Sequence, residues 1–240
     1  YRFGSKRKCP ICGFAGSKFI PMGRRPNALC PKCGAQERHR LLWYYLRNET
    51  DLIENNNDVL YFAPTDEIAK KLSLAGNNVT TIDINMDDDI NADITRLPFR
   101  DSVFDLIICV HVLEHIPDDQ GAISELTRVL VGGGDALIMV PKNKRRGCTH
   151  EDQNITSPDV RQREFGQGNH VRVYGRDFTT RLSRNGFDVE AVTYARNINS
   201  DTVERHGLII HDRGAFFGPA VSEGSQKKYE DIHHCQKVSE

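Results

Sequence analysis

The stretch FDLIICVHVLE, residues 104–114, decides the fold of this chain. Between Asp105 and His111 it is entirely apolar, which is too short for a membrane span and typical of a strand buried on both faces of a parallel sheet. The polar residues His111 and Glu114 then lie at the carboxyl edge of that sheet. Open α/β folds bind their ligands at this edge, so we expect the stretch to form the floor of an active site.

Strand and helix patterns alternate on both sides of this stretch. The other apolar runs that predict strands are 59–63, 79–84, 136–140, 187–194 and 232–238. The helical patterns are 64–74, with Thr65 as N-cap, 122–130 and 176–185, and the glycines 132–134 are expected to separate helix from strand. Strand-helix-strand units at this spacing predict an α/β fold with a doubly wound, Rossmann-like parallel sheet.

The composition excludes several classes of protein. Hydrophobic residues make up 38% of the 240 residues, which is enough for one substantial core and a small satellite domain. No apolar run approaches the roughly 20 residues of a transmembrane helix, and the start, YRFGSKRKC, lacks the apolar segment of a signal peptide. We therefore expect a cytoplasmic protein without a membrane partner, whose oligomeric state the sequence leaves open.

The overall charge of −1 hides an asymmetry between the N-terminal segment and its neighbour. Residues 1–47 hold 11 basic residues and 1 acidic one, whereas residues 48–141 hold 5 basic and 18 acidic ones. A basic segment of this kind attracts nucleic acid or another polyanion, or it docks on the acidic part of the same chain. Charge pattern alone does not separate these two interpretations.

Four of the seven cysteines form two C-x-x-C pairs, Cys9 with Cys12 and Cys30 with Cys33, and a glycine follows each pair. Two such turns bring four thiolates to one tetrahedral ion, so the spacing predicts a zinc site. The alternatives are reduced structural cysteines, two disulfides, or His39 in place of one thiolate. A closed four-ligand site has no open position for a substrate, which makes the predicted Zn²⁺ structural.

We place a zinc-knuckle module at residues 1–47 and a larger domain at residues 48–240, joined by a helix over 37–48. The basic residues at the start of this helix are Arg38, His39 and Arg40. Side chains of this kind are usually solvated, and contact with a substrate is the alternative.

Residues 142–175 form a long polar stretch without a clear apolar period. A loop of this length in a compact domain usually has a function, so we predict a substrate lid or binding loop, with a disordered connector as the alternative. The loop carries Glu151 and His170, which together with His115 are the main candidates for a catalytic general base, and His150 in the same loop is a further candidate. The competing interpretation of His115 is a hydrogen-bonded scaffold residue.

An acidic residue at the end of the second strand, here Asp83, is what a doubly wound fold uses to hold ribose hydroxyls. NAD would also need a glycine-rich loop after the first strand, and residues 62–65 read FAPT without a glycine. A cofactor with ribose and adenine but no phosphate, namely S-adenosylmethionine, is the better match.

Six segments in this order resemble the class I S-adenosylmethionine-dependent methyltransferases of the type-11-like branch: VLYFAPTDE, TIDIN, INADITRLPFRDSVFDLIICVHVLEHIPD, ELTRVL, GGGDALIMVP and RLSRNGFDV. The resemblance covers roughly residues 58–194 and implies a role for particular residues. Asp83 would bind the ribose, Asp93 and Ile94 the adenine, and His111 and Val112 the methionine end. The first motif departs from the usual acidic-x-Gly-x-Gly pattern, and the remaining expected cofactor contacts are Ala63, Pro64 and Ile84.

The layout CPIC, CPKCGAQERHR, THEDQNIT and REFGQGNHVRVYGRDF also looks like a bacterial methyltransferase subgroup with an N-terminal zinc knuckle. It is similar to zinc-containing ribosomal RNA guanine methyltransferases, whose zinc module helps to hold RNA. An Asn-Pro-Pro-Tyr motif, typical of enzymes that methylate amino nitrogens, is absent after the central strand. We therefore predict a methyltransferase acting on an oxygen or nitrogen of a polar acceptor, either a small metabolite or glycan or RNA. The alternative is a non-catalytic zinc-containing binding protein on a degenerate methyltransferase fold.

Overall fold

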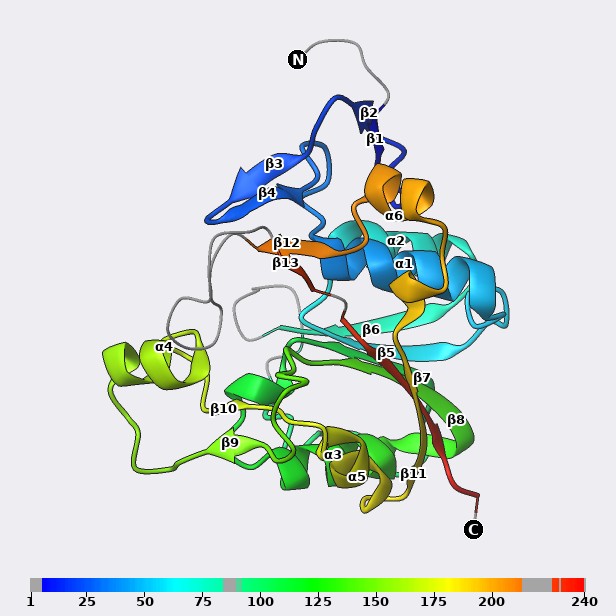
Figure 1. Ribbon diagram of the computed structural model, residues 1–240. Helices are drawn as coiled ribbons and strands as arrows, with labels where there is room; N and C mark the ends of the chain where they lie inside the picture. The colour runs from blue at the N-terminus through cyan, green and yellow to red at the C-terminus, as the bar shows by residue number, and fades with distance from the viewer. Residues whose placement is uncertain (1–5, 84–89, 91, 213–225, 229, 240) are drawn as a thin grey trace.

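The computed structural model describes residues 6–83, 90, 92–212, 226–228 and 230–239. Its centre is a six-stranded sheet with the strand order β11-β14-β8-β7-β5-β6 (Figure 1). The strands are β5 (Asp58–Phe62), β6 (Asn78–Ile82), β7 (Phe104–Val110), β8 (Leu130–Met139), β11 (Phe187–Val192) and β14 (Ile232–Lys237). Strands β5 to β8 are parallel, whereas β14 runs antiparallel to both of its neighbours. Because β11 is antiparallel to β14, it runs in the same direction as β5 to β8. The predicted parallel direction is therefore correct for five strands and wrong for β14, which inserts between β8 and β11.

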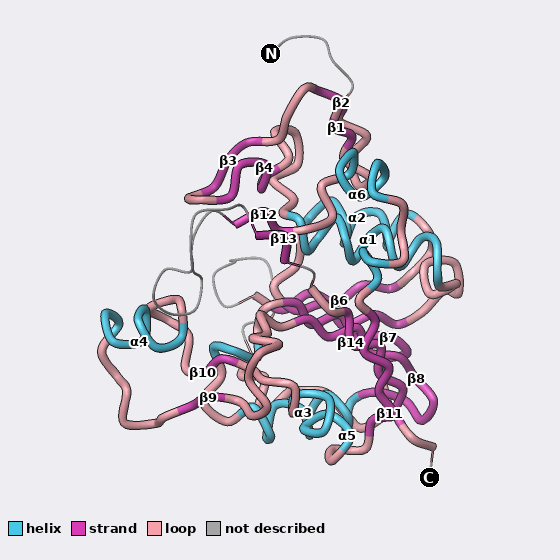
Figure 2. Tube along the Cα trace, viewed as in Figure 1, coloured by secondary structure: helices cyan, strands magenta, loops and turns pink. Residues whose placement is uncertain are grey.

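The central strand β7 is buried on both faces, as its apolar sequence predicts. Leu106 and Ile108 belong to one apolar cluster of the core, and Ile107 and Cys109 belong to the other. Helices α1 (Glu37–Glu49) and α2 (Asp66–Leu74) cover the first face, while α3 (Asp119–Val129) and α5 (Phe178–Ser183) cover the second (Figure 2). Alternate residues of β7 thus point to opposite faces of a sheet that is covered on both sides. The parallel direction of β5 to β8 brings their carboxyl ends to one edge.

The N-terminal segment is built from two short hairpins and shares its core with the sheet. The hairpin strands are β1 (Arg7–Lys8), β2 (Ala15–Gly16), β3 (Ile20–Met22) and β4 (Arg25–Leu29). Ile11 and Phe19 belong to the same apolar cluster as Val59 and Tyr61 of β5. Helix α6 (Ser200–His206) lies beside β1, where Arg7 pairs with Glu204 at 3.2 Å. The segment is thus packed onto the sheet and onto a late part of the chain.

Arg40 was expected in solvent, but its side chain is completely buried. Its guanidinium donates hydrogen bonds to the carbonyl oxygens of Ala28 at 2.9 Å and Gly207 at 2.9 Å, and it lies 4.2 Å from the centre of the Phe19 ring. Buried guanidinium groups need several acceptors in place of water. Arg40 therefore ties the N-terminal segment to the residues that follow α6, and the solvated interpretation of this residue is wrong.

Three local expectations also change. The glycines 132–134 lie inside β8 rather than before it. At Gly134 the absence of a side chain is needed, because a Cβ atom there would come within 3.0 Å of the carbonyl oxygen of Asp105 on β7. Helix α3 begins earlier than expected, at Asp119, and the Asp118 side chain caps it by accepting from the amide of Gly121 at 2.9 Å. Thr65 does occupy the N-cap position of α2, but its hydroxyl forms no capping hydrogen bond.

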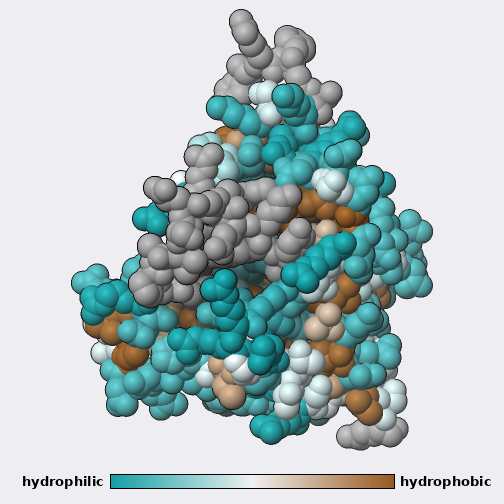
Figure 3. Space-filling model, in the orientation of Figure 1, coloured by the Kyte–Doolittle hydropathy of each residue, from teal (hydrophilic) through white to brown (hydrophobic). Residues whose placement is uncertain are grey.

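The polar stretch 142–175 contains regular structure. It holds β9 (His150–Glu151), α4 (Pro158–Phe165) and β10 (Arg172–Val173), and β9 pairs with β10. The two remaining strands, β12 (Ile210–Asp212) and β13 (Gln226–Lys228), also pair with each other. The visible face of the molecule is mostly hydrophilic (Figure 3). Among the described residues, no helix is long and apolar enough to span a bilayer.

Candidate active site and metal centre

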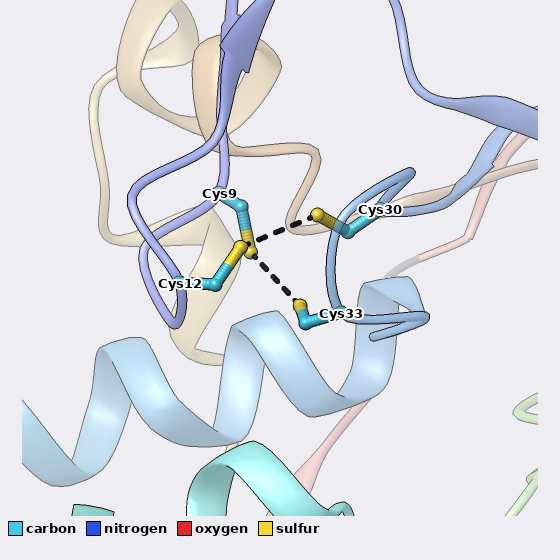
Figure 4. Close-up of side chains that lie close together, drawn as sticks. All are labelled: Cys9, Cys12, Cys30 and Cys33. Atoms are coloured by element: carbon cyan, nitrogen blue, oxygen red, sulfur yellow. Dashed lines mark hydrogen bonds between the residues drawn. The ribbon is translucent and has the colours of Figure 1, made fainter.

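The four cysteines of the two C-x-x-C pairs converge on one point (Figure 4). The sulfur of Cys9 lies 3.8 Å from that of Cys33, and the sulfur of Cys12 lies 3.5 Å from that of Cys30. A tetrahedral ion with Zn–S bonds of about 2.3 Å separates its sulfur ligands by about 3.8 Å. The spacing therefore fits a four-thiolate metal site, and all four cysteines are free thiols rather than disulfides.

The two backbone turns that carry these thiols have the same hydrogen-bond pattern. The amide of Gly13 donates to the carbonyl of Cys9 at 3.0 Å, and the amide of Gly34 donates to that of Cys30 at 2.9 Å. Both glycines have positive φ, at 73° and 69°, which other residues adopt only with strain. His39, the alternative ligand, instead accepts a hydrogen bond from the amide of Gln36 at 3.4 Å in the capping box of α1. The thiol cluster is thus complete without His39.

Two residues at the carboxyl edge of the sheet adopt left-handed backbone conformations although neither is glycine. Ala63 follows β5 with φ of 46°, and His111 follows β7 with φ of 58°. Their amides donate to the carbonyls of Ile82 and Met139, each at 2.8 Å. Such conformations cost about 1–2 kcal/mol each and cluster at functional sites. The ends of these two paired strands are therefore strained at the edge where α/β folds bind ligands.

The other predicted cofactor residues have different surroundings. Asp83 is half-buried directly after β6, and Ile84 lies outside the described residues. Asp93 is exposed and accepts hydrogen bonds from the amide of Thr95 at 2.9 Å and from its hydroxyl at 2.8 Å, which lower the pKa of Asp93. Ile94 is buried in the core. Pro64 and Val112 are both half-buried.

The imidazole of His111 lies between two carboxylates. Its Nδ1 lies 3.3 Å from Oε1 of Glu114, and its Nε2 donates to Oε1 of Glu230 at 3.0 Å. Burial disfavours the charged ring, but the negative charges of Glu230 and Glu114 outweigh it and raise the pKa of His111. The sequence does not predict a role for Glu230, because no local pattern connects it to the end of β7, 119 positions earlier in the chain.

The first turn of α1 contributes further charges to this region. Arg25 pairs with Glu37 at 2.9 Å in a buried ion pair. Burial lowers the pKa of Arg38, while the carboxylates of Glu230 and Glu114 act in the opposite direction. Burial also holds the pKa of His39 well below its usual value, assisted by the positive charge of Arg38. Arg38 and His39 are half-buried rather than fully solvated.

Two of the three main candidate bases lie together. The rings of His115 and His170 meet edge to face with centroids 4.8 Å apart. Nδ1 of His115 donates to the carbonyl of Asn169 at 3.2 Å, and Nδ1 of His170 donates to that of Phe165 at 3.2 Å. His170 is almost fully buried, which lowers its pKa to about 4. Together with Glu114, these rings place three ligand atoms within 4.8 Å of one another.

The third candidate, Glu151, lies in an ion-pair network. Its carboxylate accepts from Arg172 at 2.8 Å and from Arg181 at 2.5 Å. Burial raises its pKa, but these two arginines outweigh burial and lower it. Arg181 also pairs with Asp119 at 2.9 Å, and Tyr174 donates to Asp119 at 2.9 Å. A carboxylate paired with two arginines is a weak proton acceptor. Glu151 is therefore a poorer candidate base than His115 and His170.

Comparison with known proteins finds a matching family model and partly similar relatives. Residues 63–138 match the family model described as a methyltransferase domain. Probable tRNA methyltransferase 9B of Homo sapiens is 39% identical over 69 residues, which cover 28% of this chain and 15% of that protein. The curated relatives are matched over less than a quarter of their own length.

Two solved structures share the fold at low sequence identity. An S-adenosylmethionine-dependent methyltransferase from Mesorhizobium loti superposes with a TM-score of 0.54 at 13% identity, covering 82% of this chain and 98% of that one. The [4+2]-cyclase SpnF superposes with a TM-score of 0.53 at 16% identity, covering 96% of this chain and 90% of that one. At these identities the likeness concerns the fold alone.

Proposed function

We propose that this chain, whose residues 63–138 match a methyltransferase-domain family model, transfers the methyl group of S-adenosylmethionine to an oxygen or nitrogen of a polar acceptor. The observation that carries this proposal is His111, held at the strained end of β7 between Glu114 and Glu230. An imidazole fixed in this way at the carboxyl edge of the sheet provides a rigid polar surface against which a ligand can be positioned. In-line methyl transfer depends mainly on such positioning.

The residues that hold the cofactor in this proposal come from three neighbouring strand ends. Asp83 after β6 binds the ribose hydroxyls, and the segment of Ala63 and Pro64 after β5 lies against the cofactor. His111 and Val112 after β7 line the methionine end. Asp93 and Ile94 flank the adenine, and Ile84, which belongs to the same predicted set, lies outside the described residues.

When bound at these strand ends, S-adenosylmethionine would supply an electrophilic methyl group on its sulfonium. The chain's own residues orient the acceptor and exclude water. Glu114 is completely buried, and Glu230 and His111 are largely buried. The polar surface formed by these three buried side chains suits an acceptor with hydroxyl, carboxylate or amide groups.

We infer that the acceptor is a small polar molecule rather than RNA. In the basic N-terminal segment, Arg25 and Arg40 are buried, and Arg7 is paired with Glu204. These guanidinium groups serve internal contacts, which reduces the charge available to phosphates. The match to a tRNA methyltransferase covers only 69 residues, or 15% of that protein, and carries no information on the acceptor.

The thiol cluster is a structural zinc site in this proposal. Cys9, Cys12, Cys30 and Cys33 provide four ligands and therefore no open coordination position. Zinc bound there stabilises a segment whose apolar residues Ile11 and Phe19 continue the core of the sheet.

The fold alone does not fix the activity, since the same architecture occurs in a cyclase. The test is native mass spectrometry of the purified chain with added S-adenosylmethionine and S-adenosylhomocysteine. One bound molecule of either per chain supports the enzyme, and binding of neither points to the non-catalytic alternative. Labelled methyl groups are then followed into separate RNA and small-molecule fractions of a cell extract. Label in RNA, with an affinity that falls steeply with salt, would overturn the inferred acceptor.

A further inference from the structure

The side chains of Glu114, His115 and His170 form a second cluster with the spacing of metal ligands, separate from the cysteines. Each offers one ligand atom, and these atoms all lie within 4.8 Å of one another. Six-coordinate first-row cations hold neighbouring ligands about 3 Å apart and opposite ligands about 4.2 Å apart, because each bond is about 2.1 Å long. The separations of the three atoms, all within 4.8 Å, are close to this range.

The Glu114 carboxylate is buried beside the imidazole of His111 but lacks hydrogen bonds. The residue has no exposed surface, and neither oxygen has a hydrogen-bond partner among the described residues. His111 lies 3.3 Å from Oε1 as an ion-pair contact that lacks hydrogen-bond geometry, and it leaves Oε2 without a partner. Because a buried carboxylate oxygen without a hydrogen bond is costly, such oxygens are normally hydrogen-bonded or bound to a metal.

In both histidines Nδ1 is engaged by a backbone carbonyl, which leaves Nε2 as the nitrogen available for coordination. Nδ1 of His115 faces the carbonyl of Asn169, and Nδ1 of His170 faces the carbonyl of Phe165. A carbonyl oxygen only accepts, so the proton of each neutral ring lies on Nδ1 and the lone pair on Nε2. Metal-binding histidines use this arrangement, in which a backbone carbonyl fixes the tautomer and the ring orientation.

The backbone that carries these ligands is held by dedicated contacts. Glu114 and His115 belong to the single turn η1 (Leu113–His115), and the amide of Val171 donates to the carbonyl of Glu114 at 2.9 Å. Arg172 donates to the carbonyls of Leu113 at 3.1 Å and of Pro117 at 2.7 Å. These bonds join the turn after β7 to the segment of His170, so the ligands are preorganised by elements far apart in sequence.

We propose that Glu114, His115 and His170 bind a divalent first-row transition-metal cation at the acceptor side of the active site. Two imidazoles and one carboxylate suit Mn²⁺, Fe²⁺, Co²⁺ or Zn²⁺ better than Ca²⁺ or Mg²⁺, which prefer oxygen ligands. Three protein ligands leave coordination positions open. Resting on the proposed methyl transfer, this site selects an acceptor with a metal-binding oxygen, such as a hydroxyl, whose pKa the cation lowers.

The test titrates Mn²⁺ into the purified, zinc-loaded full chain and follows free Mn²⁺ by electron paramagnetic resonance. Mn²⁺ avoids thiolate ligands, so the cysteine cluster does not compete. We expect one Mn²⁺ per chain. Loss of an outer-shell partner alone weakens metal binding roughly 10–100-fold, so Glu114→Gln and His115→Gln should each weaken it by at least about 100-fold. His150→Gln, which changes a histidine outside the cluster, should leave the affinity unchanged.

Zinc content and circular dichroism identify any variant that fails to fold. His115→Gln changes a half-buried residue and so keeps the test open if Glu114→Gln unfolds the chain. Absence of Mn²⁺ binding, or binding that both variants leave unchanged, overturns the site. Binding of S-adenosylhomocysteine is measured on the same samples. A chain that binds S-adenosylhomocysteine but not Mn²⁺ refutes the metal site alone, and the converse result refutes the proposed methyl transfer alone.

Discussion

The Nε2 atom of His111 lies 3.0 Å from Oε1 of Glu230, although the two residues are 119 positions apart in the chain. His111 directly follows the central strand β7, and Glu230 lies two residues before the start of β14. The C-terminal strand therefore does more than extend the sheet. It brings a carboxylate to the edge at which the cofactor is proposed to bind.

Replacing Glu230 by Gln should weaken the binding of S-adenosylhomocysteine about tenfold, because His111 loses a charged hydrogen-bond partner that fixes its ring. Isothermal titration calorimetry measures this change. Glu190→Gln, on the exposed side of β11, is the matched control and should bind like the wild type. An unchanged affinity in Glu230→Gln would show that the His111–Glu230 pair does not contribute to cofactor binding.

Removing one zinc ligand should destabilise more than the N-terminal segment. Cys9 and Cys30 belong to the same apolar cluster as Val59 and Tyr61 of the sheet. Cys30→Ser is therefore expected to abolish bound zinc and to lower the unfolding temperature of the whole chain, as measured by elemental analysis and scanning calorimetry. Cys148→Ser changes an exposed cysteine and should alter neither quantity. Full zinc content in Cys30→Ser would contradict a four-thiolate site.

Arg172 is expected to be a major stabilising residue. It is 3% exposed, and it donates to the carbonyls of Leu113 and Pro117 and to the carboxylate of Glu151. Arg172→Met leaves these acceptors unpaired and should lower the free energy of unfolding by about 3 kcal/mol in urea titrations. The exposed Arg176→Met should change it by less than about 0.5 kcal/mol. Equal stability of the two variants would refute this role.

Stability should fall in mild acid partly because of His233. This residue is completely buried, and burial together with the charge of Lys142 lowers its pKa to about 4, while Asp231 acts in the opposite direction and Lys144 adds to the lowering. A neutral ring in the folded state gains a proton on unfolding, so its contribution is present above the unfolded pKa of about 6.5 and is lost as the pH falls towards 4.

The expected contribution of His233 over that range is roughly 3 kcal/mol. Free energies of unfolding are compared at about pH 7 and about pH 5 for the wild type and His233→Gln. The variant should lose less stability on acidification, because its side chain does not titrate. Parallel losses in both proteins would mean that the proton uptake on unfolding occurs at other residues.

The sequence predicts the elements whose signals are local. The apolar run before His111 and the C-x-x-C spacing each follow from a short-range rule, and the structure places the central strand and gathers the four thiols accordingly. The antiparallel β14 was not predicted as such, because direction depends on where the chain re-enters the sheet. The inward direction of Arg40 depends on carbonyls near Gly207, and pattern reasoning contains no information about them.

The site shows the same division. His111 was expected at the sheet edge, whereas Glu230 and Arg38 gain their positions only through tertiary packing. Glu151 and His170 were grouped together because they lie in one polar stretch. The pairing of β9 with β10 places Glu151 opposite Arg172, while the segment before β10 brings His170 to His115.

The central claim is most directly tested by calorimetric titration of the chain with S-adenosylhomocysteine, comparing the wild type with Asp83→Asn and with the exposed control Asp188→Asn. We predict one site per chain in the wild type and the control, and at least about tenfold weaker binding in Asp83→Asn, because a ribose-binding carboxylate forms charged hydrogen bonds. No binding by the wild type, or equal affinity in all three proteins, would contradict the account.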